Sequence, residues 1–354
     1  MEGMVDPAAW AGKKVLVTGH TGFKGSWLCH WLADLGAVVS GYALPPVEAD
    51  SLFDSIGLEH RIHSMIADIN DQARLQAFIG DYRPDVVFHL AAQSLVRQGY
   101  ENPVQTLATN VIGTANLLDA LRVCEQPCNV IIVTSDKCYL NNHDGAAAFS
   151  EEDPLGGHDP YSASKACAEL VTASYRQSYF DDGPIRVASV RAGNVIGGGD
   201  MAVDRLIPDL VRAWLDDRPL LVRYPDAVRP WQHVLEPLSG YLMLAEAMGG
   251  NRDFCRAWNF GPRHEDMISV MEVLASARSS CPGVELECVH DDGPREAAVL
   301  KLDSGDAGRL LGWHPRWCVD DAVTETMAWY TAWRAGDDMS AMTSDQIERF
   351  GKTT

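Results

Sequence analysis

Short apolar runs alternate with amphipathic stretches along the first half of the chain. Runs rich in β-branched residues predict strands at 14–18, 37–42, 61–66, 85–90, 129–135 and 185–191. The stretches between them predict helices at 26–35, 72–79, 103–123 and 161–179. Strands that are apolar throughout and alternate with helices are typical of a parallel sheet covered on both faces. The pattern therefore predicts an α/β fold built on a doubly wound parallel sheet.

This alternation weakens after about residue 193, where Pro and Trp become frequent. We predict a Rossmann-type domain over residues 1-192 and a smaller C-terminal α/β lobe over residues 193-354 that binds the substrate. The boundary is expected to be soft, with some C-terminal segments returning to the first domain.

The composition narrows the class of protein. The 354 residues are 46% hydrophobic and 22% charged, as in folded globular proteins, and their formal net charge is -20. Such a negative surface repels phosphate backbones and anionic lipids, so we expect neither nucleic acid nor membrane partners. No apolar run approaches the roughly 18 residues of a membrane span, and the first residues lack signal-peptide features, so a cytoplasmic location is expected.

Nine cysteines are scattered through the chain. Cys124 and Cys128 have a CxxxC spacing, but no second Cys or His pair follows to complete a zinc site. We expect free thiols in a reducing compartment and no bound metal.

A glycine-rich turn follows the first predicted strand and precedes a predicted helix. Gly19, Gly22 and Gly25 have the spacing GxxGxxG. In that context Gly19 permits a tight turn, Gly22 lets the backbone approach a pyrophosphate, and Gly25 lets the helix pack closely on the strand. A pyrophosphate is stabilised by the free N–H groups of a helix N-terminus. The turn predicts a dinucleotide site, with Thr21 and Phe23 among its contacts.

The end of the second strand bears on which dinucleotide is bound. The segment from Gly41 to Pro46 has neither the acid that holds an NAD ribose nor a nearby Arg for the phosphate of NADP. No Lys or Arg lies between Gly36 and Asp50, which favours NAD as the cofactor. Asp68 and Ile69 follow the third strand, where the carboxylate could accept the adenine amino group or belong to a helix N-cap region.

Two further segments carry candidate catalytic groups. Tyr161 and Lys165 are four residues apart, on one face of a predicted helix. A neighbouring ammonium lowers the pKa of a phenol, although taken alone the pair could be a surface Tyr and Lys. Ser135, Asp136 and Lys137 end an apolar strand, where ligands of parallel sheets bind, or form a polar strand cap.

The sequence resembles the CDP-glucose 4,6-dehydratase family of the extended short-chain dehydrogenase/reductase superfamily. The superfamily features are the glycine turn, Asn110 within NVIGT, the Ser135 strand end and the Tyr161/Lys165 pair. The family features are the phrases VTGHTGFKGSWL, HLAAQSLVRQGYENP, TSDKCY, EEDPLGGHDPYSASKACAE, RAGNVIGGGD, RPWQHVLEPLSGYL and LKLDS. The resemblance extends from about Trp10 to Tyr330. Better-known nucleotide-sugar dehydratases have Thr-Asp-Glu at the strand end, where this chain has Ser-Asp-Lys.

Two positions depart from the family pattern. Met201 stands where Trp is expected, and Arg295 where His is expected. Both lie in the predicted second lobe, so they bear on specificity more than on the type of reaction.

The resemblance implies the dehydration of CDP-glucose to CDP-4-keto-6-deoxyglucose. The steps are oxidation at C4 by NAD, loss of water across C5 and C6, and hydride return to C6. Tyr161, assisted by Ser135 and Lys165, would take the proton of the 4-hydroxyl, and Asp136 would protonate the departing 6-hydroxyl. Lys137 would be the C5 base or stabilise the enolate as an ammonium, with a slight preference for the base.

The resemblance also implies where the nucleotide sugar binds. Asn194, Arg205 and Arg229 are expected near its diphosphate and nucleoside, although either arginine alone could be a surface ion pair. Gln93 and Arg97 are expected to line the cleft between cofactor and sugar. A homodimer is expected through the helices near 103–123 and 161–179.

Two other functions remain open at this point. One is a nucleotide-sugar 4-epimerase, or a 4,6-dehydratase of a different nucleotide sugar. Asp136 and Lys137 argue against epimerisation, which needs no acid and base for the loss of water. The other is a catalytically silent dinucleotide-binding protein, against which the presence of Ser135, Tyr161 and Lys165 argues.

Overall fold

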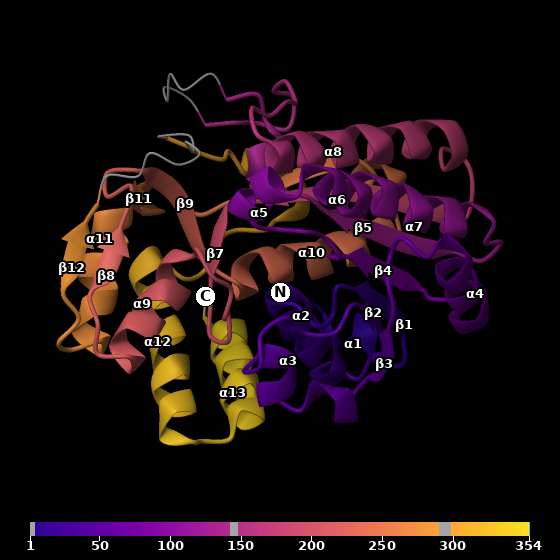
Figure 1. Ribbon diagram of the computed structural model, residues 1–354. Helices are drawn as coiled ribbons and strands as arrows, with labels where there is room; N and C mark the ends of the chain where they lie inside the picture. Colours follow the sequence, from indigo (N-terminus) through magenta and orange to yellow (C-terminus); the bar gives the residue numbers. More distant parts are fainter. Residues whose placement is uncertain (1–3, 142–147, 290–298, 354) are drawn as a thin grey trace.

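A seven-stranded parallel sheet forms the centre of the molecule (Figure 1). The computed structural model describes residues 4–141, 148–289 and 299–353. The strand order is β10-β6-β5-β4-β1-β2-β3, and every neighbouring pair is parallel. The strands are β1 (Lys14–Thr18), β2 (Val38–Ala43), β3 (His63–Ile66), β4 (Val86–His89), β5 (Cys128–Val133), β6 (Ile185–Ala192) and β10 (Ala257–Phe260). The doubly wound α/β fold and each of the strands predicted in the first half of the chain are confirmed.

Helices cover both faces of this sheet because its strands are apolar on both sides. One face is covered by α4 (Gln72–Tyr82), α5 (Val96–Glu101), α6 (Pro103–Leu107), α7 (Gly113–Arg122) and α8 (Pro160–Tyr179). The other is covered by α2 (Phe23–Asp34) and α10 (Leu235–Met248), with α1 (Pro7–Trp10), α3 (Leu52–Ser55) and α13 (Met339–Lys352) beside them.

The helix predicted over 103–123 is interrupted. A π-helical turn, Ala108–Ile112, separates α6 from α7 and carries Asn110. Single π-turns inside helices are frequent at functional sites.

In the part of the chain that the structure describes, small sheets and three helices build the second lobe. One sheet contains β7 (Asn194–Ile196), β9 (Val228–His233) and β11 (Met267–Ser269), and the other β8 (Leu220–Val222) and β12 (Leu286–Cys288). The helices are α9 (Leu206–Leu215), α11 (Val270–Ala277) and α12 (Val319–Ala335). Strand β10 comes from the C-terminal half yet lies at the edge of the central sheet, beside β6. The division at residue 193 stays a prediction.

Within the described residues, no helix is both long enough and apolar enough to cross a bilayer.

Candidate active site

The glycine turn connects β1 to α2 with the geometry that a dinucleotide site requires. Gly19 has φ 75°, and a Cβ added there would lie 2.7 Å from the backbone nitrogen of Ala91. A Cβ on Gly25 would lie 2.1 Å from the carbonyl oxygen of Gly19. Gly22 is the N-cap of α2 and forms no side-chain cap, so the first N–H groups of the helix face the turn without such a cap. These groups fit an anionic diphosphate.

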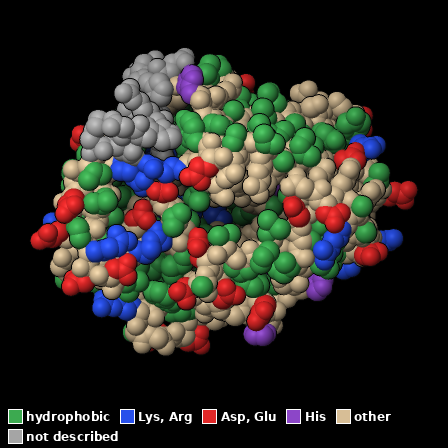
Figure 2. Space-filling view, viewed as in Figure 1, with side chains coloured by type: hydrophobic (Ala, Val, Ile, Leu, Met, Phe, Trp, Pro, Cys, Tyr) green, Lys and Arg blue, Asp and Glu red, His purple; other side chains and the backbone are tan. Residues whose placement is uncertain are grey.

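A cavity of about 710 Å³ opens at the carboxyl ends of the central strands. Its mouth is the hollow near the centre of Figure 2, where basic side chains lie within and beside it. The lining contains seven Lys and Arg side chains and six Asp and Glu side chains among the described residues. The whole chain has 29 basic and 49 acidic residues, so basic side chains are more frequent in the cavity lining than in the chain as a whole. The cavity therefore repels an anionic ligand less than the rest of the surface does.

All but one of the predicted site residues line this cavity. They are Gly19, Thr21, Gly22, Phe23, Gly25, Asp68, Ile69, Gln93, Arg97, Ser135, Asp136, Lys137, Tyr161, Lys165, Asn194, Arg205 and Arg229.

The exception is Asn110, which lies behind the cavity wall and is 2% exposed. Its amide accepts from the backbone N–H of Gln93 at 2.8 Å and donates to the Gln93 carbonyl at 2.9 Å. It also donates to the hydroxyl of Ser164 at 2.8 Å. The side chain thus fastens the loop after β4 to α8. Its assignment as a cofactor contact stays a prediction.

The end of β5 presents the Ser-Asp-Lys segment to the cavity. The Ser135 hydroxyl donates to Oδ1 of Asp136 at 3.0 Å and accepts from the backbone N–H of Lys137 at 3.2 Å. Asp136 is 1% exposed, and its Oδ2 has no hydrogen-bond partner among the described residues. Burying a carboxylate oxygen without a partner is costly, which indicates that a ligand group completes this site.

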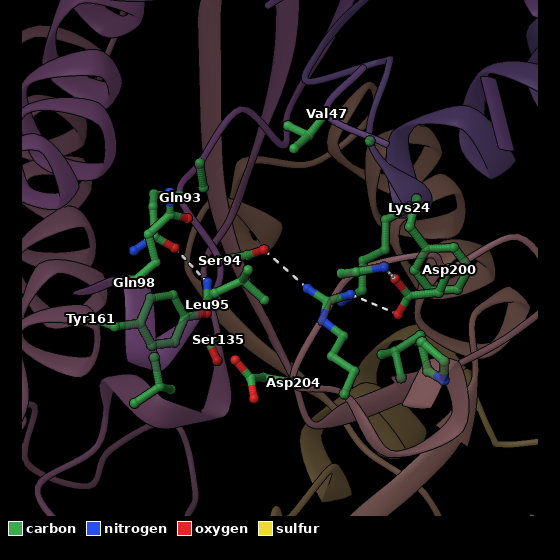
Figure 3. Close-up of a pocket in the computed structure, with 18 of the residues that line it drawn as sticks. Lys24, Val47, Gln93, Ser94, Leu95, Gln98, Ser135, Tyr161, Asp200 and Asp204 are labelled. Carbon is green, nitrogen blue, oxygen red and sulfur yellow. Dashed lines mark hydrogen bonds and ion pairs between the residues drawn. The ribbon is translucent and has the colours of Figure 1, made fainter. Parts of the chain in front are cut away.

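Tyr161 lies beside Ser135 on the same wall (Figure 3). Burial raises the pKa of the phenol to about 12, while its interaction with the Ser135 hydroxyl acts in the opposite direction. The neighbouring ammonium by itself predicts a lowered pKa for this phenol. In the ligand-free protein the burial of Tyr161 outweighs the favourable groups, so the phenol is protonated at neutral pH.

Lys165 lies one helical turn further along α8 and is 5% exposed. Its ammonium donates to the Val133 carbonyl at 3.4 Å, and burial lowers its pKa to about 8.

A buried ion pair supports this wall from behind. Glu169 of α8 accepts from Arg191 of β6 at 2.9 Å and from the hydroxyls of Thr134 and Ser189. Burial opposes its charge, but Arg191 and these hydrogen bonds together hold the pKa of Glu169 below its usual range. The pair therefore holds α8, β5 and β6 in register below the site.

On the opposite side of the cavity, arginine side chains form ion pairs with Asp200 and Asp204. Arg205 donates to Asp200 at 2.8 Å and to the Ser94 hydroxyl at 3.0 Å, which joins the two lobes (Figure 3). Asp204 pairs with Arg223 at 2.8 Å and Arg97 at 3.7 Å.

Two other predicted substrate contacts differ in their hydrogen bonding. Arg229 is 5% exposed and donates to the Val228 carbonyl at 2.9 Å. The buried Oδ1 of Asn194 has no partner among the described residues and is therefore available to a ligand donor.

Asp68, the predicted adenine contact, lies directly before a helix N-cap region. Its Oδ1 accepts from the backbone of Asn70 at 2.9 Å, while Asp71 is the N-cap of α4. Asp68 still lines the cavity, so a ligand contact remains open to its carboxylate.

His20, within the glycine turn, packs against strand β2. The imidazole packs on Gly41, where an added Cβ would lie 2.2 Å from the ring, and its Nε2 lies 2.7 Å from the Ser64 hydroxyl. Burial lowers the pKa of His20 to about 4, so the ring is neutral. The ring fills the space between the turn and β2 with an uncharged side chain.

Sequence reasoning missed several lining residues, among them Lys24, Ser94, Asp200 and Asp204. Lys24 had a signal, since it is a basic residue inside the glycine motif. The others come from segments without a recognisable pattern. Of the two departures from the family, Met201 lines the cavity, and Arg295 lies outside the described residues.

Comparisons with known proteins bear on the family and the fold of the chain. The family model described as GDP-mannose 4,6 dehydratase matches residues 16–326. A CDP-glucose 4,6-dehydratase of Salmonella typhimurium is 44% identical over 99% of both chains.

Solved structures match the fold at lower identity. One is a dTDP-glucose 4,6-dehydratase of Bacillus anthracis in complex with NAD, with a TM-score of 0.75 and 21% identity over 93% of this chain and 100% of that one. Another is a UDP-glucose 4-epimerase of Stenotrophomonas maltophila with bound NAD, with a TM-score of 0.78 and 24% identity over 92% of this chain and 99% of that one.

Proposed function

We propose that this chain, which belongs to the GDP-mannose 4,6 dehydratase family, dehydrates CDP-glucose to CDP-4-keto-6-deoxyglucose with NAD as cofactor. It is thereby a hydro-lyase. The observation that carries the reaction type is the meeting of Asp136 and Lys137 with Tyr161 in one cavity. The choice of CDP-glucose among nucleotide sugars rests on the 44% identity to the Salmonella enzyme.

The glycine turn of Gly19, Gly22 and Gly25 would hold the diphosphate of NAD, and Asp68 and Ile69 would contact its adenine. When bound, NAD supplies the hydride acceptor at C4 and the hydride donor at C6 of the sugar. Asn194, Arg205 and Arg229 would bind the nucleotide part of the substrate, with Gln93 and Arg97 between the two ligands.

Tyr161 acts as the base toward the sugar 4-hydroxyl. Since burial holds its pKa near 12, the phenolate must be stabilised when the ligands bind, and Ser135 and Lys165 are the groups in place to do so. The 4-ketone acidifies the hydrogen at C5. Lys137 then removes that proton or stabilises the enolate, while Asp136 protonates the departing 6-hydroxyl through its unpartnered Oδ2.

The test is an incubation of the purified protein with NAD and CDP-, dTDP-, GDP- or UDP-glucose in deuterated water, followed by mass spectrometry. We expect loss of one water and incorporation of one deuterium at C5 from the CDP sugar alone. Loss of water from another nucleotide sugar would overturn the specificity and keep the mechanism. An unchanged mass with inverted C4 stereochemistry would indicate an epimerase, and no reaction with bound NAD a silent binding protein.

The chain is further proposed to form a homodimer. Apolar side chains are exposed on α5–α8 and the turn between them: Tyr100, Val104, Leu107, Ile112 and Leu170, with Val104 78% and Leu170 59% exposed. Such a patch is typical of a protein interface. Light scattering should give a dimer for the native chain and a monomer for Val104→Glu combined with Leu170→Glu, and a monomeric native chain would contradict the proposal.

A cytoplasmic location is also proposed. All nine cysteines lie in the described part of the chain, and each is a free thiol. This is the state that a reducing compartment maintains. Fractionation of the native host with an antibody to the protein would test it.

A further inference from the structure

Lys24 is a cation inside the glycine turn that the proposed mechanism leaves without a role. It is the second residue of α2, and its side chain lines the cavity opposite Tyr161 and Ser135 (Figure 3). The residue is only partly exposed. Its ammonium forms no hydrogen bond or ion pair with any residue in the described ranges.

The charges around Lys24 are mostly of its own sign. Arg205, Lys165 and Lys137 all repel its ammonium, and Asp136 is the acid that favours it. Asp200, another acid that lines the cavity, is engaged by Arg205. Burial first, and then these cations, lower the pKa of Lys24 to about 7.

A partly buried ammonium among other cations is stabilised only when an anion joins it. The turn that carries Lys24 also presents the free N–H groups at the start of α2. Both features are suited to the same ligand chemistry, a nucleoside diphosphate, which brings charged oxygens and has no acidic proton near neutral pH when esterified at both ends.

We propose that Lys24 binds a nucleoside diphosphate through its ammonium, at the junction between cofactor and substrate. The proposal rests on the proposed function, because NAD and CDP-glucose are the two sources of such a group. In this role the positive charge of Lys24 offsets the negative charge of the diphosphate, together with Arg205.

The lowered pKa of Lys24 predicts that binding of the anion depends on pH. Below about pH 7 Lys24 is already charged in the free protein, and above it the ammonium must take up a proton when the diphosphate binds. Affinity should therefore be constant below pH 7 and fall as the pH rises toward 9, by up to about tenfold per unit. Arginine at this position stays charged throughout and should reduce the dependence to the part contributed by Lys165, whose pKa is about 8.

The experiment is calorimetric titration of the full chain with ADP-ribose, which carries the diphosphate of NAD but no nicotinamide, and with CDP. Four proteins are compared: the native chain, Lys24→Met, Lys24→Arg and the exposed control Lys13→Met, each with its melting temperature. Lys24→Met should bind one of the two ligands about 10- to 100-fold more weakly, the range expected for losing a charged hydrogen bond. Lys24→Arg and Lys13→Met should bind that ligand like the native chain at neutral pH.

The ligand that loses affinity identifies the source of the diphosphate. Weaker ADP-ribose binding assigns Lys24 to the cofactor, and weaker CDP binding assigns it to the substrate. Native affinity of a folded Lys24→Met for both ligands would overturn the proposal. So would an unchanged pH slope in Lys24→Arg of the affinity for the ligand that Lys24→Met weakens. Absence of ADP-ribose and CDP binding in the native chain would instead overturn the proposed function together with this assignment, so the two failures are distinguishable.

Discussion

Asp136 and Lys137 are neighbours in sequence, but the end of β5 gives their side chains different surroundings. Asp136 is buried with one oxygen held by Ser135, whereas Lys137 is partly exposed to the cavity. A buried carboxyl with a free oxygen suits a group that transfers a proton to a bound hydroxyl. A partly exposed amine in the cavity suits either a base or a compensating charge.

Substitutions of Lys137 test whether it acts as the C5 base or stabilises the enolate. Lys137→Ala should still oxidise the sugar at C4 but form product about 10²–10⁴-fold more slowly, the range for losing a general base. Rapid mixing would show reduced cofactor accumulating before any water is lost.

The matched control is Lys137→Arg, which keeps the charge and cannot serve as a base near neutral pH. An inactive Arg variant supports the base, and an active one supports enolate stabilisation. A native rate in Lys137→Ala would make this side chain structural.

At the scale of the element, the packing of α2 on the glycine turn decides whether the cofactor site exists. Gly25 lies so close to Gly19 that no side chain fits between the helix and the turn. Gly80, in contrast, lies near the end of α4 with no atom within 4 Å of an added Cβ. The same substitution therefore has opposite consequences in the two helices.

Gly25→Ala should destabilise the protein by about 1–3 kcal/mol through overpacking and weaken ADP-ribose binding. Gly80→Ala should stabilise it by about 0.4–1 kcal/mol, because alanine restricts the unfolded chain more than glycine. Urea unfolding and ADP-ribose titration of both variants provide the measurements. Equal stability of the two would mean that α2 shifts freely on the turn.

At the scale of the whole molecule, the C-terminal segments are packed into the first domain. One hydrophobic core contains Val15 of β1, Trp27 of α2 and Trp329 of α12. The Tyr330 hydroxyl donates to the Asp200 carbonyl at 2.6 Å, so α12 also holds the loop that carries part of the site. The lobes therefore share their packing rather than touching across a linker.

Glu236 of α10 holds the segment that precedes α12 through hydrogen bonds to its backbone. Its Oε1 accepts from the backbone N–H groups of Arg316 at 3.0 Å and Trp317 at 2.7 Å. Burial raises its pKa to about 8, against an ordinary value near 4.5. The folded state thus holds a proton that the unfolded state has lost, so stability falls as the pH rises from 4.5 through 8.

The native chain should accordingly lose about 1–3 kcal/mol of unfolding free energy between about pH 5.5 and pH 8 on account of this group. Glu236→Gln resembles the protonated carboxyl and should remove that loss. Urea unfolding at both pH values measures it, with the exposed Glu59→Gln as control. An equal pH slope in native and Glu236→Gln proteins would contradict the assignment.

Much of this protein follows from local sequence patterns. The apolar runs predict the parallel sheet because its strands are buried on both faces, so their period and length are visible without any tertiary contact. The glycine spacing and the Tyr161/Lys165 pair are likewise local, since one turn and one helix position all their members.

Other features depend on segments distant in sequence. Asn110 lies in a π-helical turn and forms hydrogen bonds with the loop after β4 and with α8. Strand β10 joins the central sheet from the C-terminal half of the chain. The protonated state of Tyr161 depends on its burial in the folded chain. Arg205 engages Asp200, an acid that lines the same cavity as Lys24. Desolvation and long-range charge arise only when the chain is packed, so the sequence determined which groups are present and the tertiary structure decided their charge and partners.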